Sequence, residues 1–155
     1  MSEAIRKRLS EMGVTLPQAA VPAANYVPFV RSGNMLYISG QLPAKDGIMV
    51  KGCMGKGATI EEGQEAAKLC AINILAQASS ALDGDLSKIT RCVKLGAFVA
   101  SAPDFFDHPK VVNGASDFMV AALGDAGRHA RFAVGVAALP FGVLVEVDAV
   151  FELKA

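Results

Sequence analysis

The feature that most constrains the fold is a strict alternation near the C-terminus, between residues 143 and 153. Every second residue is apolar, and the intervening positions are mixed and include three acidic residues. A period of two indicates a β-strand with one apolar face. That face must be covered by another layer, so the chain needs a sheet with something packed upon it. The residues of the apolar face are Val143, Val145, Val147, Ala149, Phe151 and Leu153.

Two segments can supply the covering layer as helices. Residues 59–82 begin with Thr59-Ile60-Glu61-Glu62, a capping box in which Thr and the third residue after it bond each other's backbone. Residues 104–123 form a second candidate, with an interruption expected at Pro109. A shorter amphipathic helix is expected at 2–12, capped by Ser2. The N-terminal stretch of about 2–20 therefore forms a helical extension.

The other strands are expected at 26–31, 35–41, 48–50, 89–100 and 130–138. After the leading helix, the order is β-β-β-α-β-α-β-β. With 155 residues and no repeat, the chain forms one domain spanning 1–155. The predicted class is α+β, with a mostly antiparallel β-sheet and two helices on one face, and the second face is left uncovered.

Composition removes several classes of function. Fifteen basic residues balance fifteen acidic ones, and no basic stripe marks a nucleic-acid surface. No run approaches the ~18 apolar residues of a membrane helix, and the N-terminus has no apolar signal core. Cys53, Cys70 and Cys92 form no CxxC pair. We therefore expect a cytoplasmic protein without a metal or other cofactor, and with no nucleic-acid or membrane partner.

The loop at 139–142 predicts a hairpin between the last two strands. In that register Gly135 lies opposite Glu146 and Arg131 lies opposite Val150, so Arg131 and Glu146 share one face. The strand of Arg131 carries the small residues Ala133 and Gly135 on that face, which leaves room for a ligand or a second subunit. The 52% apolar content also favours an oligomer. Alternatively, Arg131 and Glu146 are both ordinary surface residues.

Four sequence pieces resemble the Rid/YjgF family, also called endoribonuclease L-PSP-like proteins, between about 26 and 153. They are the GNMLYISGQLP run at 33–43, the helix with Gln64 and Asn73, the Asp104-Phe105 pair followed by Asn113, and an ending with Ala130-Arg131, Leu139-Pro140 and VEVDA at 145–149. The ending is the most specific piece because it combines residue identity with spacing. The resemblance implies a chorismate-mutase-like fold, a homotrimer and ligand clefts between subunits.

The resemblance also implies roles for five residues. Arg131 corresponds to the arginine that holds the substrate carboxylate, and Glu146 to the acid that orients a water. Tyr26 and Ser39 correspond to residues that line the cleft. Asn113 corresponds to a further substrate-binding residue, although six extra residues precede it. The residues alone also allow a strand aromatic at Tyr26, sheet packing at Ser39 and a backbone-bridging amide at Asn113.

Family members of this type hydrolyse 2-enamino or 2-imino acids to 2-oxo acids and ammonia. The planar guanidinium of Arg131 would hold the substrate carboxylate by two parallel hydrogen bonds, and Glu146 would activate water. Two alternatives stay open: a non-catalytic trimer that binds small carboxylates such as 2-oxo acids, and a ribonuclease or translation inhibitor. The helix before residue 20, the insertion near Pro109 and Ala133, where the family often has Cys, indicate a longer branch and leave the exact substrate open.

Overall fold

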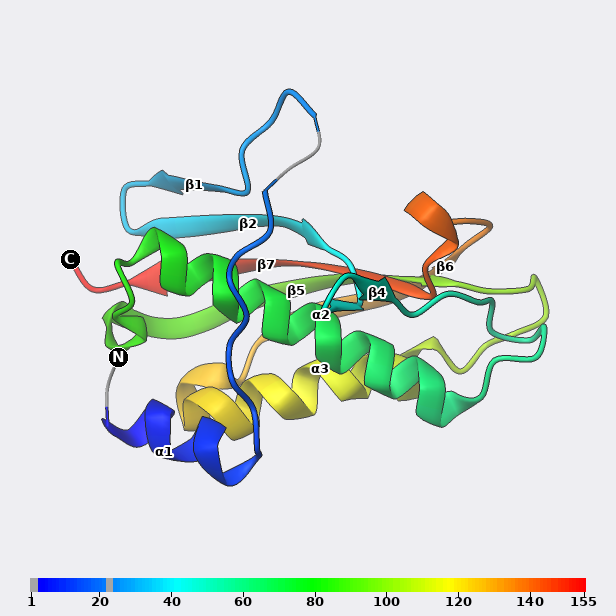
Figure 1. Cartoon of the computed structure of the whole chain (residues 1–155), viewed down its shortest axis with the longest axis horizontal. Coiled ribbons are helices and arrows are strands. Elements are labelled where there is room, and N and C mark those ends of the chain that lie inside the picture. The colour runs from blue at the N-terminus through cyan, green and yellow to red at the C-terminus, as the bar shows by residue number, and fades with distance from the viewer. Residues whose placement is uncertain (1–2, 22–23) are drawn as a thin grey trace.

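The computed structural model describes residues 3–21 and 24–155, and it forms two layers (Figure 1). A five-stranded sheet is covered on one face by two long helices, and a short third helix packs against the second of these. Ser2, the expected cap of the first helix, lies outside the described residues. The elements are α1 (Glu3–Glu11), β1 (Phe29–Ser32), β2 (Met35–Gln41), β3 (Ala44–Lys45), β4 (Ile48–Met49), α2 (Ile60–Ala81), β5 (Ile89–Ala100), α3 (His108–Leu123), β6 (Ala130–Val136) and β7 (Val145–Leu153).

The local signals in the sequence account for most of these bounds. The capping box at Thr59 forms as predicted: Thr59 Oγ1 accepts from the Glu62 N–H at 3.1 Å, and Glu62 Oε1 accepts from the Thr59 N–H at 3.1 Å. Pro109 does not interrupt α3 but lies in its first turn, where a missing N–H costs nothing. The helix therefore begins at His108, and the expectation that it begins at 104 was wrong. β1 begins at Phe29, so Tyr26 lies in the segment before it.

The alternating strand is central in the sheet, whose order is β1-β2-β7-β5-β6. β7 pairs antiparallel with both β2 and β5, and its apolar face lies beneath the helices with Val145, Val147 and Phe151 fully buried. A strand that buries one complete face this way gains about 1.5–3 kcal/mol per large apolar side chain. The mostly antiparallel α+β architecture with two helices on one face is confirmed.

The predicted hairpin between the last two strands is wrong. β6 pairs in parallel with β5, with Arg131 opposite Leu95 and Gly135 opposite Val99, and it forms the sheet edge. The reason is the connection: a parallel neighbour needs a crossover, and α3 supplies it between β5 and β6. β7 then enters on the other side of β5, where its apolar face is fully covered.

This topology also overturns the predicted shared face of Arg131 and Glu146. Arg131 has the same orientation as its buried partner Leu95, toward the helix layer. Phe98 of β5 lies between Glu146 of β7 on one side and Val134 of β6 on the other. These three residues face the uncovered side of the sheet. The arginine and the acid therefore project from opposite faces of one chain.

Candidate functional site

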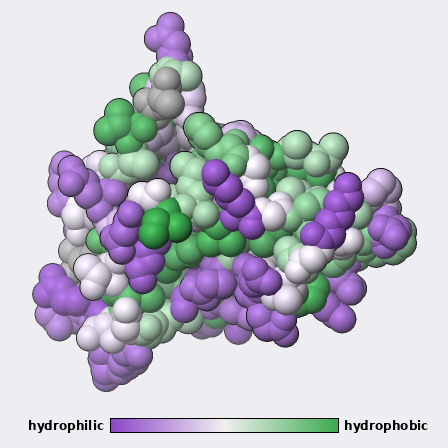
Figure 2. Space-filling view, turned by 45° about the vertical axis from the view of Figure 1, so that its right-hand side comes forward, coloured by the Kyte–Doolittle hydropathy of each residue, from purple (hydrophilic) through white to green (hydrophobic). Residues whose placement is uncertain are grey.

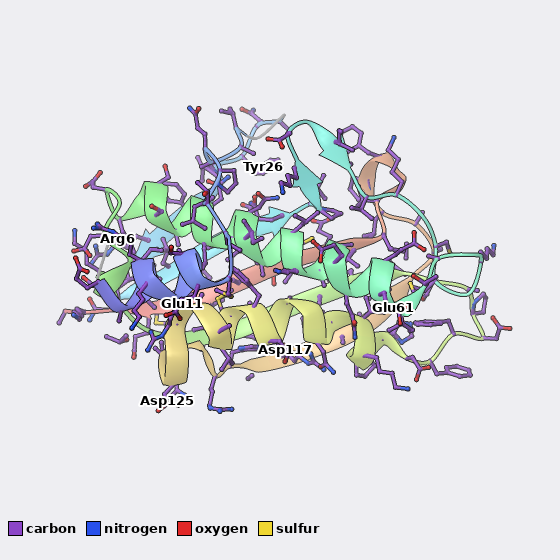
Figure 3. All side chains as sticks on the ribbon, turned by 60° about the horizontal axis from the view of Figure 1, so that its bottom comes forward. Arg6, Glu11, Tyr26, Glu61, Asp117 and Asp125 are labelled. Atoms are coloured by element: carbon purple, nitrogen blue, oxygen red, sulfur yellow. The ribbon has the colours of Figure 1, made fainter. Side chains whose placement is uncertain are left out.

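The candidate site residues fall into two groups, one at the β6 edge of the sheet and one around β2, which is the second strand from the opposite edge. Arg131 and Asn113 belong to β6 and α3, and Tyr26 and Ser39 belong to the segment before β1 and to β2. β7 and β5 lie between β2 and β6, a separation of roughly 14 Å at the spacing of neighbouring strands. Figure 3 shows α2 between the labelled Tyr26 and the labelled Asp117, which belongs to α3. One chain does not bring the two groups together.

Arg131 is held against α3 by two hydrogen bonds. Its Nη1 donates to Ser116 Oγ at 3.0 Å and its Nη2 donates to the Pro109 carbonyl at 3.2 Å. The side chain is half-buried and has no ion pair with any carboxylate in the described part of the chain. A fixed guanidinium with unused N–H donors and no counter-charge is suited to bind an anion from outside the chain.

Asn113 lies on the same stripe of α3 as the two partners of Arg131. It follows Pro109 by four residues and precedes Ser116 by three, which places all three on one helix face. The Asn113 side chain is exposed and makes no hydrogen bond with the residues described. An exposed, unpaired amide beside a fixed guanidinium adds both a donor and an acceptor to this edge. We call Arg131, Asn113 and Ser116 the arginine group.

A histidine also contacts the arginine group. His129 Nε2 lies 2.8 Å from Ser116 Oγ, and its Nδ1 lies 2.6 Å from the Gly127 carbonyl. Because the carbonyl can only accept, Nδ1 carries the proton, and Nε2 accepts from the Ser116 hydroxyl in the neutral ring. The Ser116 oxygen then accepts the hydrogen bond from Arg131. The sequence did not predict this cluster, because only the packing of α3 on β6 brings Ser116 to His129 and Arg131.

The second group lies around the β-bulge of β2, where pairing with β7 shifts between Ile38 and Gln41. Ser39 donates its hydroxyl proton to the Val27 carbonyl at 2.8 Å, and its N–H donates to the Pro28 carbonyl at 2.9 Å. These bonds attach the segment of Tyr26 to β2. Because the Ser39 proton is committed, its oxygen is available to a ligand only as an acceptor. The Tyr26 side chain is 55% exposed.

Glu146 reaches the same bulge from the uncovered face of the sheet. A side chain at Gly40 would collide with the Glu146 carboxylate, so glycine is what permits this approach. Burial raises the pKa of the Glu146 carboxyl above its ordinary value, and the neighbouring Asp148 carboxylate raises it further. A carboxyl whose pKa moves toward neutrality is a better general base. We call Tyr26, Ser39 and Glu146 the acid group.

The segment that carries Tyr26 stands out from the body of the molecule, above β1 and β2 in Figure 1 and at the top of Figure 2. It borders a pocket of about 270 Å³ that also includes Ser39 and Gly40. Phe141, from the loop between β6 and β7, is a further residue of this pocket that sequence reasoning missed. Its φ of 59° is unusual for a bulky residue. No sequence pattern in this chain predicted that the loop reaches β2.

Within residues 3–21 and 24–155, no helix is both long and apolar enough to cross a membrane. The same part of the chain has no cluster of three or more His, Cys, Asp or Glu that could hold a metal ion.

A family model described as "YjgF/chorismate_mutase-like, putative endoribonuclease" matches residues 6–153. The chain belongs to this family. It is 50% identical to Protein TCP17 of Trypanosoma cruzi, over 97% of this chain and 94% of that one. Among solved structures, it is similar to Atu1372 of Agrobacterium tumefaciens, a protein of unknown function, at 53% identity, 98% and 94% coverage and a TM-score of 0.93. A protein of Shewanella oneidensis MR-1 described as a "putative endoribonuclease" is 33% identical, with 97% and 100% coverage and a TM-score of 0.93.

These comparisons confirm the family resemblance and the chorismate-mutase-like fold that the sequence motifs implied. The match to the two solved structures covers almost the whole chain, including the helix before residue 20 and the insertion near Pro109. The long form of the domain is therefore shared with these relatives.

Proposed function

We propose that this chain is a hydrolytic deaminase of reactive 2-enamino and 2-imino acids, which it converts to 2-oxo acids and ammonia. The observation that carries the proposal is the unpaired guanidinium of Arg131, fixed by Ser116 and Pro109 with donors to spare. A planar fork of this kind fits a carboxylate by two parallel hydrogen bonds. Substrates of this class all carry a carboxylate next to the reacting carbon.

We further propose that the enzyme is a homotrimer, with each site formed by the arginine group of one subunit and the acid group of the next. Two features support this. In one chain the arginine group lies at the β6 edge and the acid group lies around β2 and β7, and Arg131 and Glu146 project from opposite faces of the sheet. The uncovered sheet face also carries exposed apolar side chains, with Val30, Tyr37 and Val134 each more than 40% exposed. An apolar face that no element of its own chain covers is typical of a subunit interface.

In the proposed reaction, Arg131 holds the substrate carboxylate and Asn113 assists it. The Glu146 carboxylate takes a proton from water as the water oxygen bonds to the imine carbon. The C=N electron pair moves to the nitrogen, which takes up a proton from solvent to give the amino alcohol. Protonated Glu146 then returns its proton to the nitrogen, the C–N bond breaks to release ammonia, and the hydroxyl gives its proton to solvent and leaves the 2-oxo acid. Ser39 Oγ accepts a hydrogen bond from the substrate nitrogen. Because the imine is already reactive, orientation and one general base supply most of the acceleration required.

The test is a coupled assay in which an amino-acid oxidase generates the imine in the presence of the protein. The deaminase should accelerate the release of ammonia and 2-oxo acid above the spontaneous rate, and heat-denatured protein should not. Tight binding of pyruvate or 2-oxobutanoate without acceleration would indicate a non-catalytic carboxylate-binding trimer. RNA binding that weakens steeply with salt would favour the ribonuclease named in the family description.

We also propose a reducing, cytoplasmic setting without nucleic-acid or membrane partners. All three cysteines are free: Cys70 and Cys92 are buried, and Cys53 is half-buried. Free thiols persist in compartments where glutathione keeps them reduced. The balance of fifteen basic and fifteen acidic residues gives no excess of positive charge for phosphate backbones.

A further inference from the structure

The 270 Å³ pocket beside β2 extends beyond the acid group, toward α2 and the N-terminal segment. It is smaller than the roughly 300–1,000 Å³ pockets that hold drug-sized ligands. It can therefore hold a side chain or a fragment of a few heavy atoms. The polar and aromatic residues that line it are Tyr26, Ser39, Gln41, Asn73, Gln77 and Phe141.

Three of these residues are amides whose NH₂ groups donate to backbone carbonyls. Gln41 Nε2 donates to the Ser39 carbonyl at 3.0 Å, and Gln77 Nε2 donates to the Ala20 carbonyl at 2.7 Å. Asn73 Nδ2 donates to the carbonyls of Leu42 and Ala44 at 2.9 and 3.0 Å. Because a carbonyl can only accept, these bonds fix each amide with its nitrogen on the backbone. Asn73 has used both of its N–H donors and offers a ligand only its oxygen, whereas Gln41 and Gln77 each offer an oxygen and one remaining N–H.

Gln77 is the decisive member of the three. Its side chain is 1% exposed, and its Oε1 has no hydrogen-bond partner among the residues that the structure describes. Buried polar atoms are nearly always hydrogen-bonded, and one left unpaired destabilises the protein. α2 buries Gln77 among alanines and large aliphatic residues, where a leucine would fill the space without that penalty. The unpaired oxygen therefore indicates a ligand with a hydrogen-bond donor.

The charge of the pocket narrows the ligand further. None of its described lining residues is Asp, Glu, Lys, Arg or His. A carboxylate would face amide oxygens with no cation to balance it, and an ammonium would leave water for mostly apolar walls. A neutral group with N–H donors avoids both costs. Tyr26 and Phe141 add aromatic surface, with Phe141 65% exposed.

We propose that this pocket is the subsite for the side chain of the substrate, and that Gln77 Oε1 selects side chains ending in an uncharged N–H donor such as a primary amide. This reading rests on the proposed function, because it is the deaminase site that places a substrate beside Ser39. Gln77 acts here as a specificity residue and takes no part in bond breaking.

The experiment has a turnover arm and a binding arm. In the first, imines are generated from glutamine and from 2-amino-5-oxohexanoic acid, an isostere in which methyl replaces the amide NH₂. Wild type should favour the glutamine-derived imine about tenfold in kcat/KM, the worth of one such hydrogen bond. Gln77→Leu should abolish the preference by slowing only the amide substrate, whereas Gln18→Leu, an exposed control, should retain it.

The binding arm uses propionamide and its isostere 2-butanone as probes on ¹⁵N-labelled wild type, so it needs no variant to fold. Propionamide should shift the Gln77 side-chain amide resonances in a saturable manner, and 2-butanone should shift them much less. Equal responses to the two probes would mean that Oε1 accepts no hydrogen bond from the amide, and would overturn the proposal. So would turnover without an amide preference. If no imine is accelerated, the deaminase proposal fails, and selective propionamide binding alone would then decide what the pocket recognises.

Discussion

Two regions of the sheet, the β6 edge and the bulge of β2 beside β7, differ in how their functional side chains are held. At the β6 edge, Arg131 is positioned by α3, through Ser116 and Pro109, and offers positive charge and donors. At the β2 bulge, Ser39 and Gly40 of β2 lie beside Glu146 of the neighbouring strand β7, and the group offers a carboxylate and acceptors. Each region supplies what the other lacks. The difference supports our proposal that the site is completed between two copies of the chain.

The largest expected effect comes from breaking the contact between copies. Val134 is 43% exposed on the uncovered sheet face, opposite Phe98. Val134→Asp should convert the trimer to a monomer, because a buried, unpaired carboxylate costs several kcal/mol at an interface. Light scattering at micromolar concentration measures the mass. Ile48→Asp, at an exposed position on β4 outside the five-stranded sheet, is the matched control and should remain trimeric. A stable monomer for the wild-type protein would refute the assembly.

The next effect concerns the acid group alone. Glu146→Gln keeps the shape of the side chain and removes the base, so turnover should fall by roughly 10²–10⁴-fold. Binding of pyruvate should stay within a few-fold of wild type. Glu152→Gln on the same strand and the same face is the control and should leave turnover intact. Loss of affinity and rate in equal measure would assign Glu146 to binding.

The arginine group should show the opposite pattern. Arg131→Ala should weaken binding of 2-oxobutanoate by ten- to a hundredfold, the loss of a charge-assisted pair of about 1.5–3 kcal/mol. Arg131→Lys should also lose affinity, because the ammonium lacks the planar fork. Calorimetry measures both, and Arg128→Ala, an exposed arginine before the same strand, should bind normally. A variant that binds as tightly as wild type would remove the anchor assignment, and one that loses the trimer would indicate a structural arginine.

A smaller effect on stability follows from the raised pKa of Glu146. Burial raises the pKa of Glu146 in the folded protein, so the unfolded chain loses this proton at a lower pH than the folded protein does. The folded state is therefore destabilised as the pH rises from the unfolded pKa to the folded pKa, and it stays destabilised above the folded pKa. Glu146→Gln should therefore be more stable than wild type at neutral pH. The advantage should shrink as the pH falls through the raised pKa toward the ordinary carboxyl value of about 4.3. Denaturant titrations across that range test the sign, with Glu152→Gln as the reference.

Local signals in the sequence predicted the helices, most strands and the helix-covered face of β7, because capping residues and alternation act over short distances. The partner of β6 was predicted wrongly. The loop at 139–142 has a hairpin length, whereas the pairing is decided by the crossover through α3 and by the burial of β7. The same error placed Arg131 and Glu146 on one face. Ser116, His129, Gln77 and Phe141 were missed because their importance depends on contacts that are distant in sequence.

The shared site can be tested directly by mixing two impaired variants, Arg131→Ala and Glu146→Gln, after dissociating and reassembling them together. If each site takes its arginine from one subunit and its acid from the next, roughly one quarter of the sites in random trimers carry both residues. We predict that the mixture regains about that fraction of the wild-type kcat/KM, while each variant alone stays at about a tenth of the wild-type value or below. Mixed trimers that form and stay at the level of the separate variants would contradict it, because a site contained in one chain cannot be restored by mixing.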